Sequence, residues 1–528
     1  MRQHDDGGTP YGEQTMNPSR TFRHFKSSVF TVFVAALALA PLGACGGGDA
    51  ASTSPDPSAP EAPGDVGHDS DVDGGAATKD AGSGEEASKP GSDAGADAPA
   101  GPTASAPIEI AAGSYHTCAL FANHAVKCWG ANVSAALGLG DDKDRGVGAG
   151  QMGSSLPIVD LGPGRTAKAL AAGDAHTCAI LDDDTVRCWG QGLYGQLGSG
   201  TTAYRGDAPN QMGANLPKLD LGPGRTAKAI AAGQAHTCAI LDDGTVKCWG
   251  ENSKGQLGDG DTVRRGDDAG EMGASLPRVD LGAGRTARAI ALGSDHTCAL
   301  LDDDTLHCWG NNYYGELGLG DSSNRGDAAG EMGANLPAVD LGPGRKAKQI
   351  TAGSQYTCAV LDDASVKCWG YVGNGQLGLG NVANRGRLPG EMGANLPAVN
   401  LGAGRTAKVV RASLFNTCAI LDDNTAKCWG LDWYGALGLG DNPTISNLYD
   451  RGDGPGEMGD NLPALDLGPG RKVLAISVGS ERACVILDDA SIRCWGHNTH
   501  GALGLGDANN RGDGPGEMGA ALPPVVLW

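Results

Sequence analysis

The chain has 528 residues, enough for several domains and a large core, yet 87 are glycine and only 6 are phenylalanine. Such frequent glycine excludes a protein of long helices, because each interior glycine costs a helix about 1 kcal/mol relative to alanine. Glycine does not recur at every third residue, which excludes collagen. The formal charge of −22 disfavours a nucleic-acid partner, because that binding relies on lysine and arginine neutralising phosphates.

Residues 1–45 have the pattern of an export signal. Cationic residues between 20 and 26 precede an uncharged apolar run over 29–40, which is shorter than the roughly 20 residues that span a bilayer. The run ends at Leu-Gly-Ala-Cys45, which resembles a bacterial lipobox. We therefore predict cleavage before Cys45 and lipidation of that residue, giving a lipoprotein of the bacterial outer membrane or cell surface. Simple cleavage without a lipid is the alternative, and Met16 is an alternative start.

Residues 46–106 are acidic and rich in Pro, Gly, Ala and Ser. They contain 12 Asp or Glu, 2 Lys and no aromatic residue, so they cannot bury enough apolar area to fold. We predict a disordered linker. The segment from Asp69 to Asp80 matches the opening of a calcium-binding loop but has no flanking helical pattern, so we interpret it as spacer and leave calcium binding open.

From 107 to 528 the chain repeats one unit seven times. The period is 60 residues, and an insertion near 443–450 lengthens the last interval to 66. Seven cysteine pairs and Cys45 account for all 15 cysteines. The pairs are Cys118 and Cys128, Cys178 and Cys188, Cys238 and Cys248, Cys298 and Cys308, Cys358 and Cys368, Cys418 and Cys428, and Cys484 and Cys494.

Each unit contains four strand-like pieces, which in the third copy are 216–221, 227–233, 236–241 and 245–250. Asp242-Asp243-Gly244 between the last two is typical of a three-residue hairpin loop. Equal steps outward from that loop place Cys238 opposite Cys248, close enough for a disulfide in every unit. A zinc site is the alternative, but these pairs lack the closely spaced ligands of zinc knuckles, and export favours disulfides.

A tryptophan follows the second cysteine of every unit and should face away from the sulfur, between neighbouring sheets. Four short strands in each of seven copies indicate an all-β protein: a seven-bladed β-propeller of four-stranded antiparallel blades. We expect residues 522–528 to supply the last strand beside the first unit.

The third copy, HTCAILDDGTVKCWGENSKGQLGDGD over 236–261, resembles the repeat of the regulator of chromosome condensation family. This resemblance covers all seven copies and implies a seven-bladed β-propeller. The cysteine pairs and an insert such as 330–345 depart from the cytosolic members, as an exported bacterial branch would. The family's guanine-nucleotide exchange on chromatin is not expected here, because the leader and the acidic charge oppose it.

Several recurring polar residues resemble functional groups, and we interpret them as structural. His116, His176, His236 and His296 share a position with Tyr356, Asn416 and Arg482, so a hydrogen-bonding role is favoured over a metal ring. Asp pairs at the hairpin tips suit turns better than catalysis. Arg-Gly-Asp occurs five times, beginning at Arg205, Arg265, Arg325, Arg451 and Arg511, and we read it as a structural turn, with adhesion or calcium binding as alternatives.

Recognition in repeat proteins falls on positions that differ between copies, and the segment after Trp-Gly varies most. Aromatic residues there are candidates for a binding rim. They are Tyr194, Tyr313, Tyr314, Tyr371, Trp433, Tyr434 and His497.

We therefore predict a non-enzymatic scaffold that binds a protein or polysaccharide of the cell surface through loops on one rim. No catalytic residue, metal, cofactor or nucleic-acid partner is expected. The lipid is the only expected membrane contact, and the protein should be a monomer. The alternatives are an extracellular enzyme or enzyme inhibitor that uses the propeller face, and a structural envelope protein.

Overall fold

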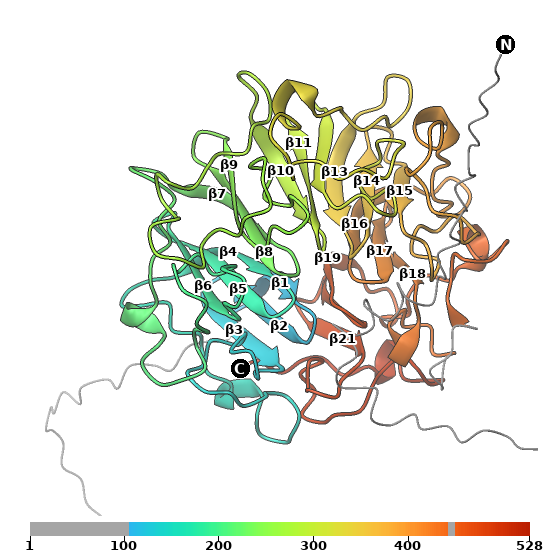
Figure 1. Ribbon diagram of the computed structural model, residues 1–528. Helices are drawn as coiled ribbons and strands as arrows, with labels where there is room; N and C mark the ends of the chain where they lie inside the picture. Colours follow the sequence, from blue (N-terminus) through green and yellow to red (C-terminus); the bar gives the residue numbers. More distant parts are fainter. Residues whose placement is uncertain (1–104, 442–448) are drawn as a thin grey trace, which may run out of the picture. The chain divides into compact units, whose positions relative to one another are not determined.

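The computed structural model describes residues 105–441 and 449–528, which form seven antiparallel sheets, one for each repeat (Figure 1). The leader, Cys45 and the acidic segment as far as residue 104 lie outside the described residues. The strands are β1 (Pro107–Ala112), β2 (His116–Phe121), β3 (Val126–Gly130), β4 (Ala167–Ala172), β5 (His176–Leu181), β6 (Val186–Gly190), β7 (Ala227–Ala232), β8 (His236–Leu241), β9 (Val246–Gly250), β10 (Ala287–Leu292), β11 (His296–Leu301), β12 (Leu306–Gly310), β13 (Ala347–Ala352), β14 (Tyr356–Leu361), β15 (Val366–Gly370), β16 (Ala407–Ala412), β17 (Asn416–Leu421), β18 (Ala426–Gly430), β19 (Val473–Val478), β20 (Arg482–Leu487) and β21 (Ile492–Gly496).

The described helices are single 3₁₀ turns. None in 105–441 or 449–528 is long and apolar enough to cross a bilayer. They are η2 (Gly153–Ser155), η3 (Gly213–Asn215), η4 (Gly333–Asn335), η5 (Gly393–Asn395), η6 (Trp433–Gly435), η8 (Gly459–Asn461) and η9 (Gly519–Ala521).

Each blade has three strands, so the prediction of four-stranded blades is wrong in this detail. The segment that lies beside the third strand of the first blade pairs with it at one residue only. Gly130 N donates to Arg145 O at 2.8 Å, and Arg145 N donates to Gly130 O at 3.0 Å. Gly146 follows at a φ of +94°, a left-handed turn that takes the chain away from the ladder. The expected strand 216–221 makes one bond to the preceding blade, from Leu219 N to Val186 O at 2.9 Å.

The predicted hairpin register is confirmed. Cys238 lies opposite Cys248, the loop closes through Leu241 N to Thr245 O at 2.8 Å, and Gly244 has a φ of +80°. The same register recurs in every blade, and all seven predicted disulfides join directly opposed cysteines whose Cα atoms are 4.1 Å apart.

One kind of core is repeated between each pair of neighbouring blades. Trp249 of the third blade is fully buried against the Cys178–Cys188 disulfide of the second, and its Nε1 donates to Gln196 O at 3.0 Å. The other six interfaces likewise pack a disulfide against the tryptophan of the next blade. The sulfur and the indole therefore face opposite sides of each sheet, as predicted.

The ring closes between the seventh blade and the first. In Figure 1, β19 and β21 in red lie beside β1 and β2 in blue, and the innermost strands β1 and β19 are in contact. Residues 522–528 run between these blades. Val525 N donates to Ile492 O at 2.8 Å, Lys127 Nζ donates to Leu527 O at 2.5 Å, and Trp528 meets Phe121 edge-on at 5.1 Å. The segment lies where expected, although it forms no strand.

Candidate functional site

The histidine position of the repeat joins each blade to the next. His236 Nε2 lies 3.0 Å from Thr297 Oγ1 of the following blade, and Tyr356 reaches Thr417 Oγ1 at 2.9 Å in the same way. The remaining histidines of this set, His116, His176 and His296, make the same contact. The hydrogen-bonding interpretation is confirmed by these contacts. No described group of three or more His, Cys, Asp or Glu side chains is arranged to hold a metal ion.

We call this hydrogen bond to the threonine of the following blade the latch. It is absent between the sixth and seventh blades, where Ala483 replaces the threonine. There Asn416 is paired with Ser413, whose Oγ lies 2.6 Å from Asn416 Oδ1 and 2.5 Å from Gly479 O. The other units have glycine at the position of Ser413, because the larger latch side chain fills that space: a Cβ on Gly113 would stand 2.3 Å from the His116 ring. In the sixth unit, the smaller Asn416 in place of a latch histidine or tyrosine leaves room for Ser413 in place of glycine.

The latch histidines should remain neutral in the folded protein. Burial lowers the pKa of His116 and His236 to about 3 and that of His176 and His296 to about 4, against an ordinary value of 6.5. Their neutral rings therefore favour folding above pH 6.5, and this contribution is lost as the pH falls towards the folded pKa. Ring proton NMR signals of these four histidines should not shift between pH 8 and 5.

His500 is the internal control for that measurement. Its Nδ1 lies 2.9 Å from Asp144 Oδ2, and this hydrogen bond raises the pKa of His500. Its ring signals should therefore titrate above pH 6.5 in the same sample. A midpoint near 6.5 for any latch histidine would contradict the neutral latch.

The aspartates at the hairpin tips form ion pairs with the arginine that precedes the first strand. Arg225 lies 2.9 Å from both Asp242 and Asp243, and Asp243 also accepts a 2.6 Å bond from Thr245 Oγ1. Equivalent pairs occur in the second and fourth to seventh units. These carboxylates hold turns, as the sequence indicated.

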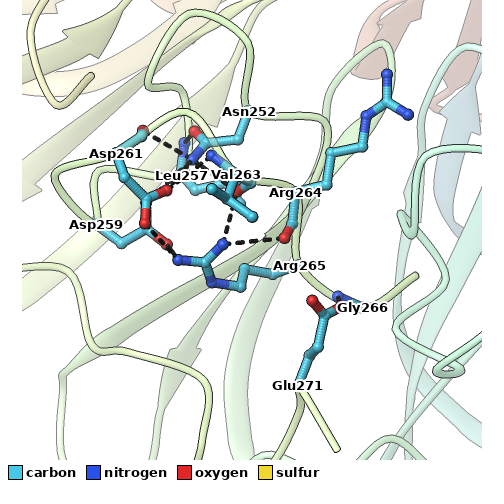
Figure 2. Close-up of polar contacts among 9 residues, drawn as sticks. All are labelled: Asn252, Leu257, Asp259, Asp261, Val263, Arg264, Arg265, Gly266 and Glu271. Atoms are coloured by element: carbon cyan, nitrogen blue, oxygen red, sulfur yellow. Dashed lines mark hydrogen bonds and ion pairs between the residues drawn. The ribbon is translucent and has the colours of Figure 1, made fainter. Parts of the chain in front are cut away.

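The Arg-Gly-Asp loops use their arginine internally (Figure 2). Arg265 Nη2 lies 2.7 Å from Asp261 Oδ2 and 3.1 Å from Asp259 Oδ2, and its Nη1 donates to Val263 O at 2.9 Å. Asn252 Nδ2 donates to the same loop at Asp259 Oδ1 and Val263 O, both at 3.0 Å. With its side chain only 16% exposed, this arginine closes a loop and is not presented to a receptor.

A glutamate completes the turn that follows. Figure 2 shows Glu271 directed at Gly266, whose N donates to Glu271 Oε2 at 2.7 Å, and Asp268 N donates to the same oxygen at 3.0 Å. The structural-turn interpretation of Arg-Gly-Asp is therefore the one that the contacts support.

Two polar side chains on the innermost strands β1 and β13 were missed at the sequence level. Glu109 Oε2 accepts a 3.3 Å bond from Leu170 N of the next blade, and Gln349 exchanges two bonds with the main chain of Val410 at 2.7 and 2.9 Å. Burial raises the pKa of Glu109 to about 7, while the charge of Arg411 opposes this shift. The innermost strand has an unpaired edge, and these side chains satisfy it.

The variable segments lie together at one end of the ring, which we call the turn face. It consists of the turns after the innermost strands and the segments after Trp-Gly. Ala131 N donates to Tyr115 O, and Tyr371 N to Gln355 O, both at 2.9 Å. A small cavity of about 110 Å³, lined by the innermost turns at residues such as Ser114 and Asp174, opens on the axis of this face.

Five of the seven candidate rim residues form two separate groups on the turn face. The first, the tyrosine–arginine patch, consists of Tyr313, Tyr314, Tyr371, Arg387 and Leu388. Tyr314 packs against Tyr313 at 4.8 Å and Tyr371 at 4.7 Å between ring centroids, and Arg387 lies 5.5 Å above Tyr313. Two apolar side chains of this patch are exposed to solvent: Tyr313 is 48% exposed and Leu388 is 59% exposed.

The second group, the tyrosine–histidine patch, lies at the ring closure and consists of Tyr115, Tyr434, His497 and His500. His497 stacks on Tyr434 at 4.2 Å, and Tyr115 meets His500 edge-on at 6.0 Å. Beside it, burial raises the pKa of Glu481 to about 7 and lowers that of His497 to about 4. Burial therefore disfavours the charged forms of both groups, which lie 3.4 Å apart.

The two remaining candidates are Tyr194 and Trp433. Tyr194 packs beneath Arg264 of the next unit at 4.8 Å, and Trp433 is half-buried in η6, next to Tyr434. Tyr194, Tyr314 and Tyr434 share one slot, and each contacts the following unit. That slot is therefore chiefly a packing position, and binding by the rim stays a prediction.

Tyr115, Arg264, Arg387 and His500 were missed. Variation at residue 115 could have revealed the first, because its slot reads Tyr, Ala, Ala, Asp, Gln, Phe and Glu across the seven units. The others need the knowledge that a loop of one unit lies on the rim segment of the preceding unit.

Three carboxyl groups beneath the turn face also depart from the repeat. Arg264 Nε lies 2.7 Å from Glu251, Gln256 Nε2 donates to Asp295 at 3.3 Å, and Tyr314 N donates to Glu316 at 2.8 Å. Burial raises the pKa of Asp295 to about 6 and that of Glu316 to about 8. Each carboxyl group has a structural partner in the protein.

Comparison with known proteins agrees with this architecture. The RCC1-like domain matches residues 74–447, and the regulator of chromosome condensation (RCC1) repeat matches residues 473–502. The ultraviolet-B receptor UVR8 of Arabidopsis thaliana is 27% identical over 405 residues, covering 76% of this chain and 79% of the receptor. The human E3 ubiquitin-protein ligase HERC2 is 26% identical over 384 residues, covering 72% of this chain and 7% of the ligase.

Two solved structures share the fold. Prp20p from Saccharomyces cerevisiae has a TM-score of 0.55 at 17% identity, covering 80% of this chain and 87% of that protein. Human WBSCR16 has a TM-score of 0.52 at 20% identity, covering 71% and 85%. The seven repeated sheets and the family match together show that this chain belongs to the RCC1-like domain family of β-propellers.

Proposed function

We propose that this propeller is an exported scaffold that binds a cell-surface protein or polysaccharide through its turn face, without catalysing a reaction. The observation that carries the proposal is the gathering of variable aromatic side chains on that face, while the recurring polar residues are occupied in latches and loops. Relatives with this fold bind proteins: yeast RCC1 (Prp20) has been solved bound to Kap60. Enrichment of aromatic residues is typical of protein interfaces.

Export and lipid anchoring are part of the same proposal. Seven disulfides within one chain favour an oxidising compartment, since cytosolic reductants keep thiols reduced. The leader pattern that ends at Cys45 supplies the route and the lipid, and we infer that the protein acts as a monomer.

Capture from a cell-envelope extract tests the binding face. Three proteins are immobilised: the native full chain, a turn-face variant carrying Tyr115→Ser, Tyr313→Ser and Trp433→Ser, and a control. The control carries Lys228→Ser and Lys348→Ser, which replace two exposed lysines at the ends of β7 and β13 that lie away from the turn face. We expect a protein or polysaccharide that the native chain and the control retain and the turn-face variant loses at least tenfold. Retention by all three would reject the turn face, and capture of nothing would favour a structural envelope protein.

A further inference from the structure

The loop of the fifth unit differs in charge from its equivalents. Residues 261–271, 321–331 and 507–517 each have a formal charge of −2, whereas 381–391 contain two arginines and one glutamate and have a charge of +1. Arg387 stands where five other units have the aspartate of Arg-Gly-Asp. On a chain of charge −22, this loop is a local cationic site.

Neither Arg385 nor Arg387 forms an ion pair with a carboxylate of the described residues, whereas the equivalents of Arg385 in five other units do. Arg325 is paired with Asp321 at 2.6 Å, but Arg385 has Asn381 in that place and reaches its Oδ1 at 3.4 Å. Arg387 is exposed, and no carboxylate among residues 105–441 and 449–528 forms an ion pair with it. Glu391 uses its Oε2 to accept from the main-chain N of Arg387 and Leu388, at 2.9 and 2.8 Å.

Apolar surface surrounds this charge. Arg387 lies over the ring of Tyr313, which belongs to the preceding unit, and the neighbouring Leu388 is 59% exposed. Beneath the tyrosines, burial raises the pKa of Glu316 to about 8, so this carboxyl group is protonated at neutral pH and does not neutralise the arginine. A central anchor surrounded by apolar contacts is the usual form of an interface hot spot.

We propose that the tyrosine–arginine patch is the docking site for an acidic segment of a partner protein. A carboxylate of the segment pairs with Arg387, whose planar guanidinium can donate to both carboxylate oxygens, and an aromatic or aliphatic side chain packs on Tyr313 and Leu388. The inference rests on the proposed function and names the chemistry and place of its partner. It predicts binding that weakens as salt rises, because an exposed charge pair is screened.

Selection of peptides on the protein tests this site. Random dodecapeptides displayed on phage are selected against the immobilised full chain, and enriched peptides are measured by fluorescence anisotropy against variants. Arg387→Asp restores the residue of the other units, so it should fold. Asp327→Asn, at the equivalent place in the fourth unit, is the matched control. We expect enriched peptides rich in Asp and Glu with one aromatic or aliphatic residue, binding at least tenfold more weakly to Arg387→Asp and to Tyr313→Ser but unchanged with Asp327→Asn.

Several results would overturn the proposal. These are enrichment of basic or neutral peptides, equal binding to the native chain and Arg387→Asp, and enrichment of no peptide. Polygalacturonate is measured in parallel, and binding of it with the same dependence on Arg387, while acidic peptides fail, would replace the protein segment by an acidic polysaccharide. If the envelope component is lost with the turn-face variant but kept by Arg387→Asp, the proposed function stands and this docking site is rejected.

Discussion

Reduction of the seven disulfides is expected to unfold the ring. Each bond closes a loop between cysteines ten residues apart, such as Cys238 and Cys248, and a loop of this length contributes about 3 kcal/mol in the chain-entropy model. Seven bonds then contribute roughly 20 kcal/mol, which exceeds the net stability of about 5–15 kcal/mol of most proteins. Circular dichroism of the reduced and alkylated chain should show loss of the strand signal at 25 °C.

A single pair offers a graded control. Cys238→Ala with Cys248→Ala removes one bond and should lower the free energy of unfolding by about 3 kcal/mol, with the fold retained. Denaturation by guanidinium with the other six bonds intact measures the difference. A reduced chain that keeps native circular dichroism would show that the interfaces between blades, not the cross-links, hold the ring together.

Replacing Arg482 by leucine should open the junction between the last blade and the first. Its guanidinium is fully buried and donates to the carbonyls of Gly113 and His116, at 3.0 and 2.5 Å, and to that of Ser114. Burial lowers the pKa of Arg482 to about 10, so the group stays charged at neutral pH. Leucine cannot donate these three buried hydrogen bonds, and we expect a decrease of about 3–5 kcal/mol in the free energy of unfolding.

Arg482 also donates from its Nε to Thr117 Oγ1 at 3.4 Å, in the place of a latch. The variant Arg482→His tests this latch separately from the charged guanidinium. A histidine at this position can reach Thr117 of the first blade, just as the histidines of the first four units reach the threonine of the following blade. This variant should therefore lose less of the free energy of unfolding, about 1–2 kcal/mol. The comparison uses guanidinium denaturation of both variants with disulfides intact. Equal losses for leucine and histidine would mean that the carbonyl bonds, and not the threonine latch, provide all of the stabilisation at this junction.

Much of the fold could be predicted from the sequence, because the same turn, cysteine and tryptophan positions recur in all seven units. The loop Asp242-Asp243-Gly244 sets the hairpin register, and the register alone pairs Cys238 with Cys248 and turns Trp249 to the other side. The absence of a fourth strand could not be predicted. The expected piece 216–221 makes one bond to the preceding blade, and the segment at Arg145 leaves the sheet after one residue at a left-handed glycine.

The candidate site could be predicted only in part. Tyr313 and Tyr371 were found because they vary between copies. Arg387 was missed, since its place over Tyr313 depends on how one unit lies on the preceding one. Sequence variation marks which residues differ, while contact between successive blades decides which of them meet.

The path of residues 522–528 has a consequence for how the chain matures. These residues follow all seven hairpins in the sequence, yet they provide the main-chain oxygen of Leu527 that Lys127 of the first blade needs. In the proposed export from the amino end, each hairpin can oxidise as it emerges, because its two cysteines are ten residues apart in the sequence. The first blade therefore stays incomplete on one side until residues 522–528 pack between it and the seventh blade.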